Sequence, residues 1–221
     1  MHSPNHQTTI TGAILAGGRG TRMGGRDKGL IPLAGGYMVE RVIDRLRPQV
    51  SDMLLNANRN ETFYADLGLP VVGDDIGDYA GPLAGLAACL RASRHPWVVT
   101  CPCDAPLLPT DLVPRLIHAA HEQATDLSVA HDGERLQPLF ALVPTRLAQD
   151  LAHWLANGNR RTGRWFEHHG AAIADFSDCP EAFLNINTPA DQAEAITRLD
   201  TRRVSHTQSH AGQPIAEERR P

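Results

Sequence analysis

The stretch from Leu15 to Lys28, L-A-G-G-R-G-T-R-M-G-G-R-D-K, contains five glycines and follows the apolar run Ile10–Leu15. The apolar run predicts a buried strand, and the glycines predict a loop at its end. Because glycine has no Cβ, the backbone N–H groups of the loop can approach a ligand closely and form an anion-binding concavity. Arg22 adds a planar guanidinium and Lys28 a compact ammonium, and both groups bind phosphate oxygens. The stretch therefore predicts a site for a nucleoside triphosphate.

Two known phosphate-binding patterns do not fit this loop. The dinucleotide pattern G-x-G-x-x-G, begun at Gly18, has Met23 in its sixth position. The Walker pattern is excluded because the sequence contains neither Gly-Lys-Ser nor Gly-Lys-Thr. A plain flexible turn is the remaining alternative, but a turn would not need two cationic side chains within a glycine-rich run directly after a strand.

The glycine-rich stretch resembles the nucleotidyltransferase signature of the molybdenum cofactor guanylyltransferases, and its G-G-x-x-T-R-M core is shared with sugar-phosphate nucleotidyltransferases. Four later segments match the molybdenum family in the same order, namely Asn56–Arg59, Gly81–Gly85, Cys101–Asp104 and Asn185–Pro189. The resemblance spans Ile10 to Leu199. It implies transfer of GMP from GTP to molybdenum-molybdopterin, with Mg²⁺ as the cofactor and pyrophosphate as the second product.

Asp104 lies in the loop Cys101–Pro106, directly after the apolar run Trp97–Thr100. A carboxylate there can hold Mg²⁺, which takes one or two protein carboxylates together with phosphate oxygens. A loop cap is the alternative role for this aspartate, and the proline-flanked loop favours metal binding. In the family that the sequence resembles, the matching aspartate is the magnesium ligand. We expect Arg22, Lys28 and Asp104 to be the catalytic residues, without a protein nucleophile.

Asn56 and Asp74 are candidates for contact with the base or ribose, because Asn56 ends one expected strand and Asp74 comes shortly after another. Aspartate accepts from guanine N–H groups and asparagine bonds to ribose or base edges, but both residue types are also common in turns. The residues alone leave these roles open, and the resemblance places both side chains against the guanosine part of GTP. The expected GTP-binding set is Leu15, Ala16, Gly17, Lys28, Asn56, Asp74 and Asp104, the first three through their backbone.

The acceptor side of the crevice is expected near Asn185 and Asn187, which lie two apart at the end of an expected strand and so share a face. The resemblance places this segment on the acceptor side. Gly81 and Gly85 open a helix and allow close approach either to a ligand or to a neighbouring strand. A basic cluster after the turn 157–159 is a second acceptor candidate, and a solvated helix start is its alternative. The cluster comprises Arg160, Arg161 and Arg164.

The composition argues against a general nucleic-acid or membrane-surface binder, because the formal charge is −4 and no basic field is evident. No apolar run approaches the length of a membrane span, and Met1–Thr9 lacks the apolar centre of a signal peptide, so we expect a cytoplasmic protein. The four cysteines are too few and too scattered for a disulfide framework. Cys101 and Cys103 are expected to be buried packing residues.

Apolar runs alternate with amphipathic segments and predict a single α/β domain with a Rossmann-like, mostly parallel sheet flanked by helices. The resemblance implies the nucleotide-diphospho-sugar transferase type of this fold. The expected strands are Ile10–Leu15, Asp52–Asn56, Pro70–Val72, Trp97–Cys101, Asp126–Ala130, Leu139–Leu142, Ala171–Ala174 and Phe183–Ile186. The expected helices are Met38–Arg47, Glu61–Leu67, Gly81–Ser93, Thr110–Gln123, Thr145–Ala156, Arg160–His168 and Pro189–Leu199, with Thr110 and Thr188 as N-caps.

Three segments follow from this pattern. Residues 1–9 are expected to form a mobile lead and residues 10–199 the nucleotidyltransferase domain. Residues 200–221 carry almost no apolar side chains and are expected to be a disordered tail. In an open α/β sheet, the loops after the strands face one crevice, which would bring the glycine-rich loop close to Asp104.

Two other functions remain open. One is cytidylyl transfer to the same pterin, and the other is a nucleotide-binding carrier that hands cofactor to apo-enzymes without chemistry. The combination of Lys28 and Asp104 favours chemistry, because a carrier would not need a metal at the α-phosphate. GTP and molybdenum-molybdopterin are the expected substrates, and molybdoenzymes or their chaperones are the candidate recipients of the product.

Overall fold

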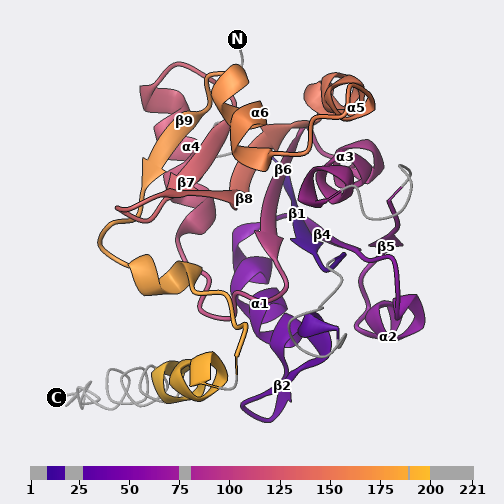
Figure 1. The fold of residues 1–221 in the computed structure, drawn as a ribbon, viewed down its shortest axis with the longest axis vertical. Helices are drawn as coiled ribbons and strands as arrows, with labels where there is room; N and C mark the ends of the chain where they lie inside the picture. Colours follow the sequence, from indigo (N-terminus) through magenta and orange to yellow (C-terminus); the bar gives the residue numbers. More distant parts are fainter. Residues whose placement is uncertain (1–8, 18–26, 75–80, 189, 200–221) are drawn as a thin grey trace, which may run out of the picture.

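The computed structural model describes residues 9–17, 27–74, 81–188 and 190–199. Within these ranges the chain forms an α/β domain around a seven-stranded sheet (Figure 1). Arg22 and most of the glycine-rich loop lie outside the described residues, as do nearly all of the expected N-terminal lead and the whole of the expected tail.

The sheet has the order β5-β4-β1-β6-β8-β7-β9. Its strands are β1 (Ile10–Leu15), β4 (Asp52–Asn56), β5 (Val71–Val72), β6 (Trp97–Pro102), β7 (Ser128–His131), β8 (Leu136–Pro144) and β9 (Ala172–Asp175). Strand β8 is antiparallel to both of its neighbours, and the other pairings in this sheet are parallel. The expected mostly parallel sheet is therefore confirmed.

The register of the three central strands brings their carboxyl ends to one level. Leu15 of β1 is paired with Asn56 of β4 on one side and with Pro102 of β6 on the other. Beyond the strands, the backbone N–H of Ala16 donates to the carbonyl of Asn56 at 2.8 Å, and the N–H of Cys103 donates to the carbonyl of Leu15 at 3.1 Å. The loops that follow these strands consequently start side by side, as a ligand crevice at this edge requires.

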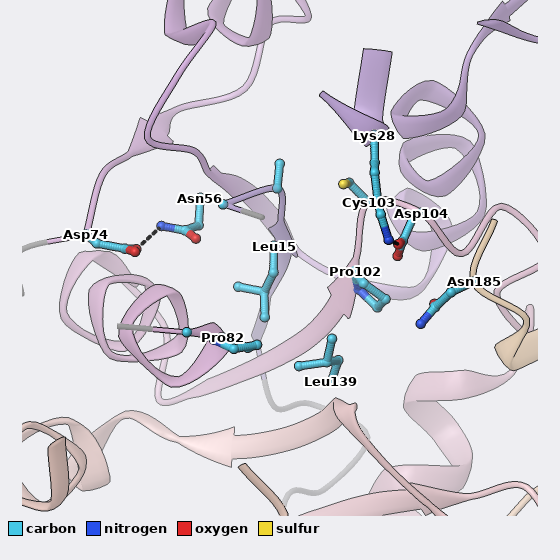
Figure 2. Close-up of a pocket in the computed structure, with 13 residues that line it drawn as sticks. Leu15, Lys28, Asn56, Asp74, Pro82, Pro102, Cys103, Asp104, Leu139 and Asn185 are labelled. Carbon is cyan, nitrogen blue, oxygen red and sulfur yellow. Dashed lines mark hydrogen bonds and ion pairs between the residues drawn. The ribbon is translucent and has the colours of Figure 1, made fainter. Parts of the chain in front are cut away.

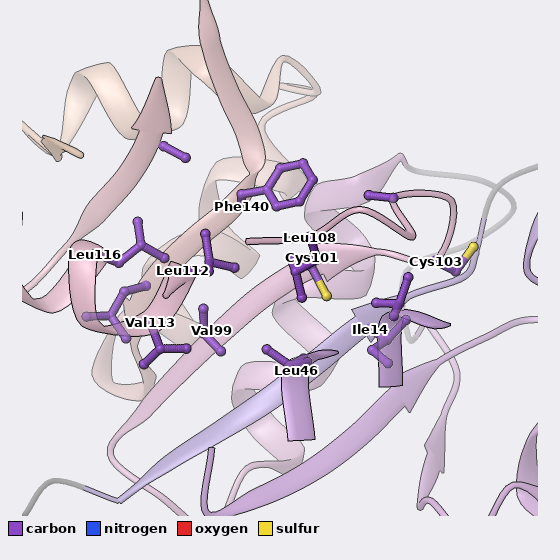
Figure 3. Close-up of a cluster of buried hydrophobic side chains, with 14 of the residues drawn as sticks. Ile14, Leu46, Val99, Cys101, Cys103, Leu108, Leu112, Val113, Leu116 and Phe140 are labelled. Atoms are coloured by element: carbon purple, nitrogen blue, oxygen red, sulfur yellow. The ribbon is translucent and has the colours of Figure 1, made fainter. Parts of the chain in front are cut away.

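Helices cover both faces of the sheet. They are α1 (Met38–Leu46), α2 (Glu61–Asp66), α3 (Pro82–Ala92), α4 (Leu112–Glu122), α5 (Ala148–Ala156) and α6 (Thr162–His168), and residues 190–199 are also helical. Side chains of β6 alternate between the faces: Val99 and Cys101 join a core with α1 and α4 (Figure 3), whereas Val98 joins a second core with α3, α5 and α6. Because both faces are covered, β6 is buried along its whole length.

A third, smaller core ties the C-terminal helix to the N-terminal half of the chain. It contains Ile31 and Leu33 near the hairpin of β2 (Pro32–Leu33) and β3 (Gly36–Tyr37), together with Ile186 and Ala195. The Gln192 side chain donates to the carbonyl of Pro32 at 2.6 Å. This core holds the segment before residue 190 against the turn that follows the glycine-rich loop.

The N-cap expectations have different outcomes. The N-cap expected at Thr188 is confirmed. Its Oγ1 accepts from the N–H of Asp191 at 3.2 Å, and the Asp191 carboxylate accepts in turn from the N–H of Thr188 at 2.8 Å. The N-cap expected at Thr110 is wrong. Helix α4 begins at Leu112, and its N-cap is Asp111, which makes no side-chain cap bond. Thr110 therefore comes one residue before the N-cap position.

The strand expected at Phe183–Ile186 is also wrong. Residues Pro180–Phe183 form a 3₁₀ turn, η5, and the residues after it are irregular. The Phe183 ring packs edge-on against Phe140 and Phe176, with ring centroids 4.8 and 5.2 Å away. The apolar character of this run therefore serves a core contact and not a strand pairing. The β2–β3 hairpin was not expected, because strands of two residues are too short to show a period.

Candidate active site

A cavity of about 590 Å³ lies at the carboxyl ends of β1, β4 and β6 (Figure 2). In Figure 2, Asn56 and Asp74 lie on one side of Leu15, and Lys28, Asp104 and Asn185 lie on the other. The residues that line it are Leu15, Ala16, Gly17, Lys28, Asn56, Asp74, Gly81, Pro82, Pro102, Cys103, Asp104, Leu139 and Asn185. The structure thus gathers the whole expected GTP-binding set in one cavity.

The first end of the cavity, the Asn56 end, is lined by Asn56 and Asp74, and Asn58 contacts Asp74 there. The Asn56 amide donates to one carboxylate oxygen of Asp74 at 2.8 Å and to the carbonyl of Val72 at 3.1 Å. The Asn58 amide donates to the other Asp74 oxygen at 2.8 Å, and Asn58 accepts from the Asp74 backbone N–H at 2.7 Å. Both oxygens of Asp74 are therefore held in place, and the carboxylate still faces the cavity.

Asn58 was not singled out from the sequence, although it belongs to the motif Asn56–Arg59. A signal was available, since Asn56 and Asn58 lie two apart at a strand end and side chains with that spacing share a face. What the sequence does not show is that both amides converge on Asp74, which follows a different strand.

Gly85 allows α3 to approach the Asn56 side chain. A Cβ at this position would lie 2.2 Å from Asn56 Oδ1 and 2.9 Å from its Cγ, which is closer than such atoms can come. At Gly17 a Cβ would lie 3.2 Å from the same Oδ1. Of the two roles left open for Gly85, the structure supports close packing, here against a residue that lines the cavity.

The second end, the Asp104 end, joins three distant segments. Lys28 Nζ lies 2.7 Å from Asp104 Oδ2 and donates to Asn187 Oδ1 at 2.6 Å. The backbone N–H of Ile186 donates to the carbonyl of Asp104 at 3.0 Å. Asp104 is 6% exposed, so its charge is partly desolvated and interacts more strongly with the ammonium than it would in water.

The donors at the Asp104 end fit a magnesium ion that is shared with phosphates. The described residues contain no cluster of three or more His, Cys, Asp or Glu side chains that could hold a metal by themselves. Mg²⁺ does not require one, because it binds through one or two carboxylates and takes its other ligands from water and substrate phosphates. Asp104 offers such a carboxylate inside the cavity, and its contact with Lys28 shows that it accommodates a positive charge there.

Cys103 lines the cavity but is not poised as a nucleophile. Burial raises the pKa of its thiol well above the ordinary value, and the nearby carboxylates of Asp104 and Asp27 add to the effect. The neutral thiol is a poor nucleophile, because the thiolate is the reactive form. Cys101 and Cys103 are both buried, which confirms the packing role expected for them.

Of the residues expected on the acceptor side, the structure brings Asn185 to the cavity and not Arg160 or Arg161. Asn185 lines the cavity, and its Oδ1 is buried without a hydrogen-bond partner among the described residues. The Asn187 Oδ1 accepts from Lys28 Nζ at 2.6 Å, and its Nδ2 donates to the carbonyl of Asn185 at 3.0 Å. Neither asparagine lies in a strand, so the shared strand face expected for this pair is wrong. Arg160 and Arg161 are not among the lining residues, and Arg160 donates to the carbonyl of Leu155 at the end of α5.

Comparison with known proteins defines the class first. Residues 12–173 match the family model described as a MobA-like NTP transferase domain. The match covers most of the chain, so the chain belongs to the MobA-like NTP transferase family and is a nucleotidyltransferase.

Within this family, the curated relatives are molybdenum cofactor guanylyltransferases. They confirm the resemblance to that group that the sequence motifs indicated. Molybdenum cofactor guanylyltransferase of Shewanella sediminis is 43% identical over 192 residues, which cover 86% of this chain and 98% of the relative. The protein of the same name from Shewanella sp. strain MR-4 is 44% identical over 191 residues, which cover 86% and 97%.

Solved structures agree on the fold. Molybdopterin-guanine dinucleotide biosynthesis protein A of Archaeoglobus fulgidus matches with a TM-score of 0.67 and 21% identity, over 86% of this chain and 99% of that chain. A 4-diphosphocytidyl-2C-methyl-D-erythritol synthase of Anaerococcus prevotii matches with a TM-score of 0.65 and 14% identity, over 87% and 96%. None of the helices in the described part of the chain is long and apolar enough to span a bilayer.

Proposed function

We propose that this chain transfers GMP from GTP to molybdenum-molybdopterin and releases pyrophosphate. The observation that carries the proposal is a single cavity with the Lys28–Asp104 pair, 2.7 Å apart, at one end and the Asn56–Asp74 contact, 2.8 Å, at the other. The first pair suits a triphosphate and its metal, and the second suits a purine base. The names of the curated relatives support the same substrates.

The phosphate chemistry follows from the Asp104 end. An oxygen of the terminal phosphate of the pterin attacks the α-phosphorus of GTP, the bond to the β-phosphate oxygen breaks, and pyrophosphate leaves. Lys28 neutralises charge on the triphosphate and on the leaving pyrophosphate. Asp104 would hold Mg²⁺, which supplies Lewis-acid polarisation of the α-phosphate when bound.

The acceptor is a phosphate monoester that is largely ionised near neutral pH, so no side chain has to remove a proton. In addition, Arg22, which lies outside the described residues, is proposed to contact the triphosphate.

Base selection follows from the Asn56 end. Both Asp74 oxygens already accept one hydrogen bond each from an asparagine amide, and a carboxylate oxygen has room for a second donor. Guanine presents N1–H and its exocyclic amine as adjacent donors, whereas cytosine lacks this arrangement. Leu15, Ala16 and Gly17 line the same cavity. We therefore propose that Asp74 reads guanine.

The test is a pyrophosphate-release assay with GTP, CTP, ATP and UTP, each with and without the pterin acceptor. We expect rapid release only with GTP and acceptor, and a smaller preference for GTP over CTP in Asp74→Ala. Asp66→Ala is the matched control, because Asp66 is an exposed aspartate on α2. Equal or better use of CTP would overturn guanine selection and leave the phosphate chemistry. GTP binding without pyrophosphate release under any condition would indicate a carrier.

We further propose that the reaction depends on Mg²⁺ and that its product serves molybdoenzymes. Mg²⁺ dependence is tested by removing metal with EDTA and adding back Mg²⁺, which should restore pyrophosphate release. Transfer of the product to molybdoenzymes or their chaperones, in the cytoplasm, is what the proposed reaction would serve.

A further inference from the structure

Asp27 is a buried carboxylate next to Lys28 that the proposed reaction does not use directly. Its side chain is only 3% exposed. One oxygen accepts from the Tyr64 hydroxyl at 2.6 Å and from the Gly29 backbone N–H at 3.2 Å. The other accepts from the Asn60 amide at 2.9 Å and lies 3.6 Å from Arg59 Nε. A buried charge is tolerated only when it is paired and hydrogen-bonded, and Asp27 meets both conditions.

The partners of Asp27 come from two separate parts of the chain. Gly29 belongs to the 3₁₀ turn η2 (Lys28–Leu30), whose N-cap is Asp27 itself. Asn60 is the N-cap of α2, in the left-handed region at φ 53°, and Tyr64 lies within α2. The carboxylate therefore fastens the turn that carries Lys28 to the β4–α2 connection, which leaves the sheet directly after Asn56.

Tyr64 and Gly29 are fitted to each other. Tyr64 is fully buried, and a Cβ at Gly29 would lie 2.5 Å from its hydroxyl oxygen, so only glycine lets the hydroxyl reach Asp27. Burial raises the pKa of the Tyr64 hydroxyl far above its ordinary value, and the hydrogen bond to Asp27 adds to this. Tyr64 is thus a neutral hydrogen-bond donor to the Asp27 carboxylate.

We infer that Asp27 is a positioning residue for Lys28. The lysine side chain is a flexible four-carbon stem, so the place of its ammonium depends on how firmly its backbone is held. The Asp27 network fixes that backbone, and Lys28 Nζ then lies between Asp104 Oδ2 and Asn187 Oδ1, at 2.7 and 2.6 Å. This inference rests on the proposed function, in which Lys28 binds the triphosphate of GTP.

The experiment is a double-mutant cycle between Asp27→Asn and Lys28→Ala, measured as kcat/KM for GTP in the pyrophosphate-release assay. Loss of a hydrogen bond to a charged group lowers affinity or rate about tenfold or more. We expect Asp27→Asn to lower kcat/KM about tenfold in the wild-type background and to change it less than twofold when Lys28 is already alanine. Tyr64→Phe removes one donor and keeps the ring. It should lower kcat/KM for GTP about threefold in the wild-type background and have little effect when Lys28 is already alanine.

A matched control separates positioning from stability. Asp132 is another buried carboxylate, 9% exposed, which accepts from the N–H groups of Glu134 and Arg135 and from Gln137, in the β7–β8 turn. Asp132→Asn should lower the melting temperature and leave kcat/KM for GTP unchanged.

The outcomes distinguish this inference from the proposed function. Two results would overturn the positioning role alone. In one, the losses in transition-state free energy from Asp27→Asn and Lys28→Ala add in the double mutant. In the other, Asp27→Asn does not lower kcat/KM for GTP. If Lys28→Ala itself leaves GTP kinetics unchanged, both the role of Lys28 and the positioning role are overturned. Should Asp27→Asn fail to fold, the cycle with Tyr64→Phe decides in the same way.

Discussion

The two ends of the cavity differ in how their polar groups are hydrogen-bonded before any ligand is present. At the Asn56 end, Asn56, Asn58 and Asp74 are held by four hydrogen bonds, three among themselves and one from the Asn56 amide to the carbonyl of Val72. At the other end, Lys28 and Asp104 are paired, but Asn185 beside them carries a buried Oδ1 with no partner among the described residues.

This difference indicates how each substrate would be bound. Groups that are already held in place do not lose side-chain freedom on binding, so the Asn56 end is suited to selecting one base. An unpaired buried oxygen costs free energy until a donor reaches it, so Asn185 is suited to a ligand that supplies an N–H or O–H group. A pterin carries several such donors. The comparison therefore predicts separate effects on the two substrates when each end is altered.

The largest effect is expected at Asp104. Asp104→Asn keeps the shape of the side chain but loses the charge that would hold Mg²⁺, and turnover should fall about 100-fold or more, as when other preorganised electrostatic groups are removed. Mg²⁺ titration should also show weaker binding in the presence of GTP. Asp126→Asn is the control, because Asp126 forms an ion pair with Arg146 away from the cavity lining. Near-normal turnover in Asp104→Asn at ordinary magnesium concentration would remove Asp104 from the catalytic set.

Lys28→Ala should have the next largest effect. A hydrogen bond to a charged group contributes about 1.5–3 kcal/mol, which corresponds to a roughly ten- to hundredfold loss in kcat/KM for GTP. Steady-state kinetics with varied GTP concentration at saturating pterin acceptor measure this loss in kcat/KM. Arg198→Ala, which breaks an exposed ion pair with Glu194, should leave the kinetics as they are. Wild-type kinetics in Lys28→Ala would contradict the assignment of this end to phosphate.

Gly85→Ala should alter the Asn56 end without touching a ligand. The new methyl group would lie 2.2 Å from Asn56 Oδ1, so the amide has to move and its bond to Asp74 is lost. We expect KM for GTP to rise about tenfold, the size of one hydrogen bond to a charged group, with a smaller change in kcat. Gly163→Ala makes the same substitution where the nearest atom is 4.0 Å away, and it should be neutral. Equal KM values for the two variants would show that Asn56 need not be held in place.

The smallest effect is expected at Asn185. Removing one neutral hydrogen bond in Asn185→Ala should raise KM for the pterin acceptor about fivefold and leave KM for GTP unchanged. Arg160→Ala provides the comparison, because Arg160 was expected on the acceptor side and the structure does not bring it to the cavity. A larger rise in acceptor KM for Arg160→Ala than for Asn185→Ala would move the acceptor to the α5–α6 connection.

Much of the fold could be predicted from local patterns. Strands β1 and β4 have the expected bounds, because a run of buried apolar residues between turn signals identifies a strand that is covered on both faces. Phe183–Ile186 shows the limit of this reasoning, since a short apolar run has the same appearance whether it pairs in a sheet or fills a core beside Phe140.

The sequence by itself determined the class of fold, the family and the identity of the residues at the strand ends, because hydrophobic period and motif spacing are local properties. Tertiary structure alone decided which of those residues meet. Lys28 is 76 residues from Asp104 and 159 from Asn187, and only the strand register and the small core under the C-terminal helix bring their atoms within 2.7 Å. The same holds for Asp27 and Tyr64, 37 residues apart. Hydrogen bonds depend on distances of tenths of an ångström between atoms, and such distances are fixed by packing and not by order along the chain.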